Sequence, residues 1–169
     1  PNAICGVVTL MVFYNVGRKL VDNRFGLIWV LVYAGSFLPH FYFKSGIIDP
    51  WFNLFIFLGV YKAIQNTNDV NSPSSNKSAI LSGLFIGLAT LTKGPAALLI
   101  FGLTALVFWV RKKFARVSTF KSICIFGLSF IVTAGSWFAY EILTGNLQLV
   151  KDFIEYQIRL FNTKDAGHG

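Results

Sequence analysis

The sequence contains six long apolar runs with few charges, and these runs constrain the fold more than any other feature. They lie near residues 3–17, 25–43, 50–65, 79–92, 95–110 and 121–143. Hydrophobic residues make up 54% of the chain and charged residues 13%, values outside the ordinary soluble range. A membrane-crossing helix needs about 20 residues, so the second and sixth runs are long enough and the third and fourth are short. The sequence predicts an all-α fold, a polytopic transmembrane helix bundle of about six crossings over residues 1–143.

The positions of the basic residues predict the orientation of this bundle. Ten of the 15 Lys and Arg residues lie in the first, third and fifth loops, and five lie on the other side. Basic loops stay in the cytoplasm, so the second set, with Lys93, is expected on the outer side. The same rule favours two crossings over one kinked crossing for residues 79–110. Membrane topology therefore explains the net charge of +8, and we expect a lipid bilayer and no nucleic acid as a partner.

Residues 144–169 are predicted to begin an outer-face loop. From Leu147 onward, apolar residues recur every three or four positions, with charged residues between them, which is typical of an amphipathic helix lying at a membrane interface. The chain opens with Pro1 and ends in a polar stretch. We therefore expect an internal fragment of a longer protein.

Asp49 is the most unusual residue of the sequence, because it is an acid between two long apolar segments. Ionisable groups in such places are costly and commonly functional. One interpretation is a catalytic carboxylate that accepts a proton from a nucleophile or orients a cation. The other is a helix N-cap, since Asp directly before Pro50 is a favourable helix start. The two roles can coexist.

Further candidates lie on the same predicted outer side. Lys93 adjoins Gly94 and Pro95, where a cation could hold a phosphate, although a lysine at an interface also snorkels without binding anything. Arg159 either binds an anion or pairs with Glu155 four residues earlier. Lys44 is a further candidate for substrate binding, and His168 is a candidate metal ligand.

The segment Gly83-Leu-Phe-Ile-Gly-Leu-Ala-Thr-Leu-Thr-Lys-Gly-Pro95 resembles a G-L-x-x-L-T-K-G-P segment of bacterial membrane glycosyltransferases of the C superfold. These are the protein-mannosyltransferase and aminoarabinose-transferase-like enzymes of glycosyltransferase family 39. Asp49, the start of the chain and the segment Tyr156–Phe161 with His168 are similar to further parts of that family. The resemblance spans nearly the whole chain.

The resemblance implies a transferase that takes a sugar from a polyprenyl-phosphate carrier and passes it to an acceptor at the outer face of the bacterial inner membrane. Asp49 would be the second acidic residue of its active site, Lys93 and Arg159 would hold phosphate, and His168 would bind a divalent metal ion. The family's main catalytic acid lies in a loop that this chain lacks. The fragment alone is therefore expected to be inactive.

Two other classes of function remain open. A transporter or flippase would use Asp49 as a coupling residue, and would show charges near the midplane and two related halves, neither of which is evident. A non-catalytic membrane scaffold would leave the outer polar residues unexplained.

Overall fold

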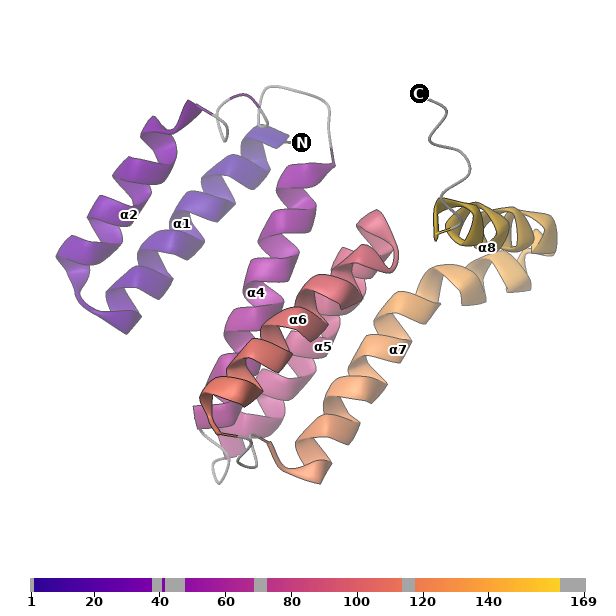
Figure 1. The fold of residues 1–169 in the computed structure, drawn as a ribbon. Helices are drawn as coiled ribbons and strands as arrows, with labels where there is room; N and C mark the ends of the chain where they lie inside the picture. Colours follow the sequence, from indigo (N-terminus) through magenta and orange to yellow (C-terminus); the bar gives the residue numbers. More distant parts are fainter. Residues whose placement is uncertain (1, 38–40, 42–47, 69–72, 114–117, 162–169) are drawn as a thin grey trace. The chain divides into compact units, whose positions relative to one another are not determined.

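The computed structural model describes residues 2–37, 41, 48–68, 73–113 and 118–161, and every regular element in them is a helix. The helices are α1 (Asn2–Leu20), α2 (Asn23–Gly35), α4 (Asp49–Asn68), α5 (Pro73–Lys93), α6 (Ala96–Arg111), α7 (Phe120–Leu143) and α8 (Leu147–Phe161). Figure 1 shows their order along the chain. The predicted all-α fold is confirmed for this part of the chain.

Two of the described helices are long and apolar enough to cross a membrane, α1 and α7. The 24 residues of α7 span about 36 Å at 1.5 Å per residue, more than the roughly 30 Å of hydrocarbon in a bilayer. Its outward side chains are apolar, with Leu128 66% and Ile131 65% exposed. α6 is equally apolar but has only 16 residues. Surfaces of this kind are stable in lipid rather than in water, so the chain is a membrane protein.

The chain divides into two compact units, residues 1–58 and 59–169, with the boundary inside α4. In the first unit, α1 and α2 form an antiparallel hairpin. The carboxylate of Asp22 caps α2 by accepting a hydrogen bond of 2.7 Å from the backbone N–H of Phe25. A Cβ atom on Gly17 would lie 2.9 Å from the Cα of Gly26, so the two helices touch through their backbones. Small residues at this crossing permit that close approach.

An aromatic cluster holds the first half of α4 in the same unit. Phe13 of α1 stacks on Trp29 of α2 with ring centroids 4.9 Å apart, and meets Phe57 of α4 edge-on at 5.0 Å. Tyr33 approaches Phe13 at 4.7 Å. Edge-to-face and stacked pairs of this kind each add about 0.5–1.5 kcal/mol beyond their buried area.

In the second unit, α5 packs directly on α7. A Cβ atom on Gly83 would lie 2.5 Å from the carbonyl oxygen of Phe126, and one on Gly87 would lie 2.7 Å from the Cβ of Thr133. Gly83 and Gly87 form a G-x-x-x-G pair, and such pairs let two membrane helices pack closely. The hydroxyl of Ser82, on another face of α5, donates to the carbonyl of Gly59 at 2.8 Å. α5 is thus the central helix of this unit.

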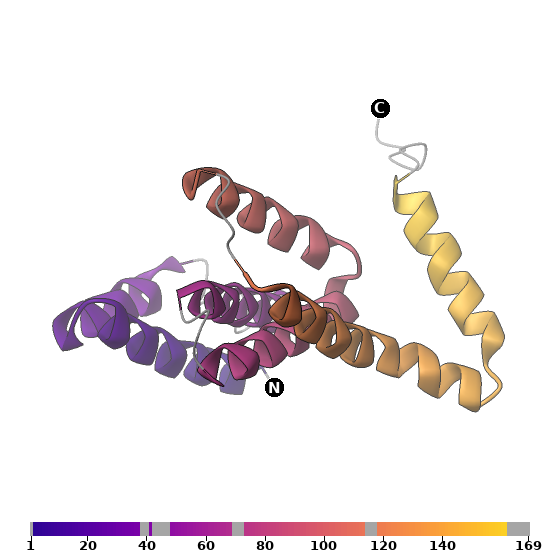
Figure 2. The same cartoon turned by 90° about the horizontal axis from the view of Figure 1, so that it is seen from below.

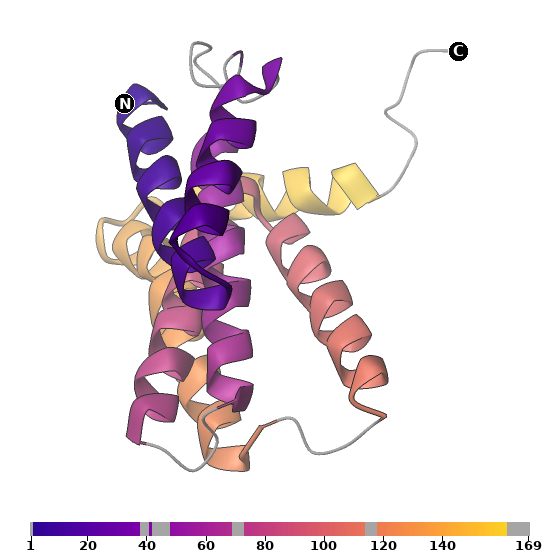
Figure 3. The ribbon, with the colours of Figure 1, turned by 90° about the vertical axis from the view of Figure 1, so that its left-hand side faces the viewer.

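α6 and α8 have fewer contacts with that core, although the ring of Phe101 on α6 stacks on that of Phe126 on α7 with centroids 5.2 Å apart. α6 leaves the end of α5 and diverges from α5 and α7 along its length (Figures 2 and 3). α8 turns away across the far end of α7 (Figure 1). The predicted amphipathic helix is therefore present, with its charged residues Lys151, Asp152, Glu155 and Arg159 all exposed.

Candidate functional site

The junction between α5 and α6 is built from Lys93, Gly94 and Pro95. Gly94 has a φ of +64°, and its N–H donates to the carbonyl of Thr90 at 2.7 Å, which ends α5. This left-handed conformation is the usual helix C-cap and strongly favours glycine. The carbonyl of Pro95 then accepts the N–H of Leu98 at 3.0 Å, which starts the next helix. The expected break between residues 79–92 and 95–110 therefore exists, and it leaves Lys93 exposed as the last residue of α5.

An apolar cavity of about 500 Å³ adjoins this junction. Thr90, Leu91, Gly94, Pro95 and Leu98 line it from the junction, and Ala134, Trp137, Phe138 and Phe153 line it from α7 and α8. The size is within the usual range for a small-molecule site. The walls of the cavity are apolar, and Lys93 directly precedes Gly94 at the end of α5. The cavity is therefore suited to an amphiphilic ligand with an anionic group.

Three aromatic rings form the wall of the cavity opposite the junction. The ring centroids of Trp137 and Phe153 lie 5.3 Å apart, those of Phe138 and Phe153 lie 5.7 Å apart, and those of Trp137 and Phe138 lie 5.0 Å apart. Phe153 thereby fastens α8 to the end of α7. These aromatics were not among the site residues predicted from the sequence. The position of Trp137, one turn before Glu141 and the helix end, was the available signal.

Glu141 stabilises the bend between α7 and α8. Its side chain is 9% exposed, and one carboxylate oxygen accepts a hydrogen bond of 3.0 Å from the amide of Asn146. The Asn146 N–H also donates to the Glu141 carbonyl at 2.9 Å, and Gly145 between them has a φ of +80°. Glu141 was not among the site residues predicted from the sequence. These contacts give it a structural role in positioning α8.

Asp49 lies at the first residue of α4, in the unit of residues 1–58. It is half-buried, Pro50 after it is buried, and the N–H of Phe52 donates to the Ile48 carbonyl at 3.2 Å to open the helix. The predicted helix start at Asp-Pro is therefore present. Lys93 and Arg159 belong to the other unit, residues 59–169.

Arg159 does not face the cavity wall. It is exposed in the last turn of α8, six residues after Phe153. At 1.5 Å and 100° per residue, it lies about 9 Å along the helix from Phe153 and about 120° around it. Lys93 thus directly precedes the cavity-lining residue Gly94 in the sequence, and Arg159 lies on another face of α8 from the cavity-lining Phe153.

Lys44 and His168, the remaining candidates from the sequence, lie outside the described residues. Within the described part of the chain, no three His, Cys, Asp or Glu side chains are grouped so as to hold a metal ion. The expectation of a metal therefore depends on His168 alone.

The fold and this site define a helical membrane protein with an amphiphile-sized cavity beside a cationic helix end. Residues 1–137 match the family model of the dolichyl-phosphate-mannose-protein mannosyltransferases. The match covers most of the chain, so the chain belongs to this family, whose general activity is glycosyl transfer at a membrane. The resemblance read from the sequence is confirmed. No curated protein and no solved structure matches the chain.

Proposed function

We propose that this chain is part of an enzyme that transfers a sugar from a polyprenyl-phosphate carrier to an acceptor at the outer face of the bacterial inner membrane. The observation that carries the proposal is the position of exposed Lys93 directly before Gly94, one of the residues that line the apolar cavity of about 500 Å³. A polyprenyl phosphate is an amphiphile with an anionic phosphate and a long hydrocarbon chain. Its phosphate pairs with a cation, and its hydrocarbon chain lies against Leu91, Leu98 and Phe153.

The chemistry of transfer gives roles to the other candidates. When the sugar leaves, negative charge develops on the carrier phosphate, and a nearby cation stabilises it. Lys93 takes this role, with Arg159 and Lys44 as further phosphate or acceptor ligands. Asp49 accepts the proton of the attacking group or orients it. His168 is the proposed ligand of a divalent metal ion.

The proposed membrane arrangement has about six crossings over residues 1–143. α4 and α5 have 20 and 21 residues, about the length of a crossing, although their ends are polar. In this arrangement the α5–α6 junction, Asp49 and α8 lie on the outer side. The donor's hydrocarbon chain then remains in the bilayer while its sugar reaches the outer surface.

The cation is tested by replacing Lys93 with Gln in the protein expressed from its complete reading frame. Loss of a charge-assisted contact to phosphate lowers transfer from a radiolabelled polyprenyl-phosphate sugar by about tenfold to a hundredfold. Lys77→Gln is the matched control, because Lys77 is also exposed on α5. Equal transfer by both variants at equal expression would remove Lys93 from the site.

The carboxylate is tested by Asp49→Asn in the same assay. Loss of a general base costs about 10²–10⁴ in rate, whereas loss of a helix-start residue changes stability and leaves the rate of the folded enzyme intact. Asp152→Asn is the control, an exposed acid on α8 that accepts a hydrogen bond of 3.0 Å from Gln148. A normal rate for Asp49→Asn would reduce Asp49 to a helix-start residue.

A further inference from the structure

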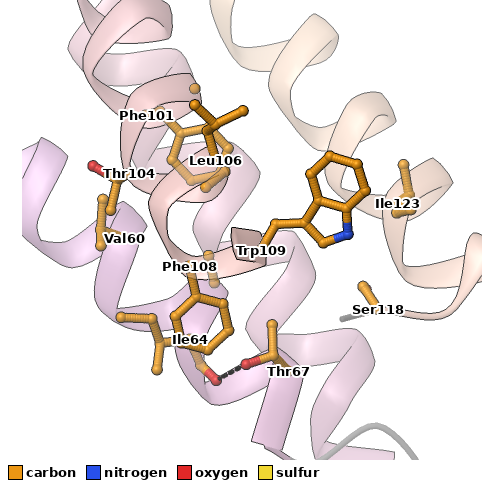
Figure 4. A pocket seen from close by; sticks show the side chains of 13 residues that line it. Val60, Ile64, Thr67, Phe101, Thr104, Leu106, Phe108, Trp109, Ser118 and Ile123 are labelled. Atoms are coloured by element: carbon orange, nitrogen blue, oxygen red, sulfur yellow. Dashed lines mark hydrogen bonds between the residues drawn. The ribbon is translucent and has the colours of Figure 1, made fainter. Parts of the chain in front are cut away.

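A second apolar cavity, larger than the first, lies along the opposite half of α6. It measures about 720 Å³ and is lined by the second half of α4, by α6 and by the start of α7 (Figure 4). Its walls include Val60 and Ile64 from α4, Phe101, Leu106 and Trp109 from α6, and Ile123 from α7. The proposed transfer reaction does not use this cavity.

One end of this cavity is polar. Thr67 and Ser118 line it there, and Figure 4 shows both away from the apolar side chains of Phe101 and Leu106. The amide of Asn66 donates to the Ser118 hydroxyl at 3.1 Å, and Asn66 in turn accepts a hydrogen bond from Ser75. The cavity thus has a hydroxyl-bearing end held by a hydrogen-bond network, and a hydrocarbon-like remainder.

The polar end also carries positive charge. The ammonium of Lys112 lies 5.6 Å from the ring centroid of Phe108, and Phe108 lines the cavity. Lys113 and Lys121 are exposed nearby in sequence, and the positive end of the α7 dipole starts at Phe120, two residues after Ser118. Between Gly59 and Tyr140 the sequence has eight Lys or Arg residues against one acid, Asp69. An anionic group is therefore favoured at this end.

Polarity and access from the bilayer identify the occupant. Water alone is disfavoured, because apolar cavities stay dry. In the proposed membrane arrangement, lipid surrounds the outer face of α6, where Leu103 and Val107 are 63% and 56% exposed. An acyl chain can therefore enter directly from the bilayer.

We propose that this cavity binds one anionic glycerophospholipid, with an acyl chain between α4, α6 and α7 and its phosphate at the Lys112 and Ser118 end. The lipid fills the space that the divergence of α6 leaves open and ties α6 to α4. The proposal is independent of the sugar-transfer function, since it uses a different cavity with a different set of residues.

The experiment uses Trp109 as a reporter within the cavity wall. The full-length protein in detergent is titrated with phosphatidylglycerol carrying brominated acyl chains, which quench nearby indoles. The fluorescence of Trp109 is obtained as the difference in emission between the protein and its Trp109→Phe variant. We expect saturable quenching by phosphatidylglycerol at lower concentration than by brominated phosphatidylcholine. Lys112→Gln and Lys113→Gln should each weaken phosphatidylglycerol binding about fivefold.

A cavity-filling variant separates this site from general lipid contact. Gly102 lines the cavity, and a Cβ added there meets nothing within 4 Å, so Gly102→Leu fills the space without a backbone clash. It should abolish the saturable quenching, whereas Gly127→Leu, equally open but outside the cavity, should retain it. Unchanged quenching in Gly102→Leu, equal binding of both lipids, or displacement by inorganic phosphate alone would each overturn the proposal.

Discussion

α5 and α6 leave the same Gly94 junction but pack in opposite ways. α5 meets α7 at Gly83 and Gly87 so closely that no Cβ fits at either position. On α6, by contrast, a Cβ at Gly102 meets nothing within 4 Å, and cavities of about 500 and 720 Å³ lie beside the two ends of the helix.

This difference in packing indicates that α5 contributes mainly to stability and α6 mainly to ligand binding. Apolar side chains gain little from meeting one another in lipid, so close contact between membrane helices depends on small residues that let backbones approach. α5 has these residues on the face toward α7. α6 presents large side chains such as Leu98, Phe101 and Trp109, which line the two cavities. The unit is therefore held together by α5, and its ligand-sized spaces lie beside α6.

The largest effect is expected from Gly83→Leu. Its Cβ would lie 2.5 Å from the Phe126 carbonyl oxygen, and backbone cannot move aside as a side chain can. We expect a loss of about 3 kcal/mol of folding free energy, at the upper end of overpacking costs. Unfolding in SDS, followed by circular dichroism, measures it. Gly102→Leu on α6 is the comparison variant, and an equal loss there would break the contrast between the two helices.

The second effect is expected at the junction itself. Gly94 has a φ of +64°, so Gly94→Ala places a Cβ in the left-handed region at a cost of about 1–2 kcal/mol. Because the turn orients Lys93, sugar transfer should fall as well. Gly94→Asn, which tolerates this conformation better, should recover part of both losses. Recovery of stability without recovery of transfer would mean that Lys93 acts independently of the turn.

The sequence predicted the features that depend on local chemistry. The break at Lys93-Gly94-Pro95 and the amphipathic α8 were both predicted from residue type and position, and both are present. Each apolar run contains a helix in its described part. The count of six crossings stays a prediction, because four of the helices are short or have polar ends.

The site was less predictable, because it depends on how distant side chains meet. Trp137 and Phe153 are 16 residues apart, and only the bend held by Glu141 and Asn146 turns one ring toward the other. The periodicity of apolar residues within a helix does not predict the angle between α7 and α8. Asp49 was predicted from the cost of charge in apolar sequence and Lys93 from its place beside Gly94 and Pro95, which are local signals, whereas the prediction for Arg159 depended on the orientation of α8.

A third, smaller effect concerns that bend. Phe153→Ala removes the ring contacts with Trp137 and Phe138 that hold α8 against α7. The loss of these contacts should cost about 1 kcal/mol. α8 should detach and become susceptible to trypsin at Lys151, and the cavity beside Gly94 should lose one wall. Ile154→Ala is the control, since Ile154 is 48% exposed on the same helix. Equal trypsin cleavage of both variants would show that Phe153 does not hold α8.

The smallest effect has the opposite sign and tests the α6 half of the contrast directly. A glycine inside a helix costs about 0.5–1 kcal/mol relative to alanine, mostly through the entropy of the unfolded chain. At Gly102, where an added Cβ is unopposed, Gly102→Ala should therefore stabilise the protein by that amount. At Gly87, where a Cβ would lie 2.7 Å from Thr133, the same substitution gains the same entropy but must displace α7. Paired SDS titrations of Gly102→Ala and Gly87→Ala should thus move in opposite directions. Stabilisation of both variants would mean that α7 shifts away from Gly87 without a loss of folding free energy. α5 would then pack no more tightly than α6.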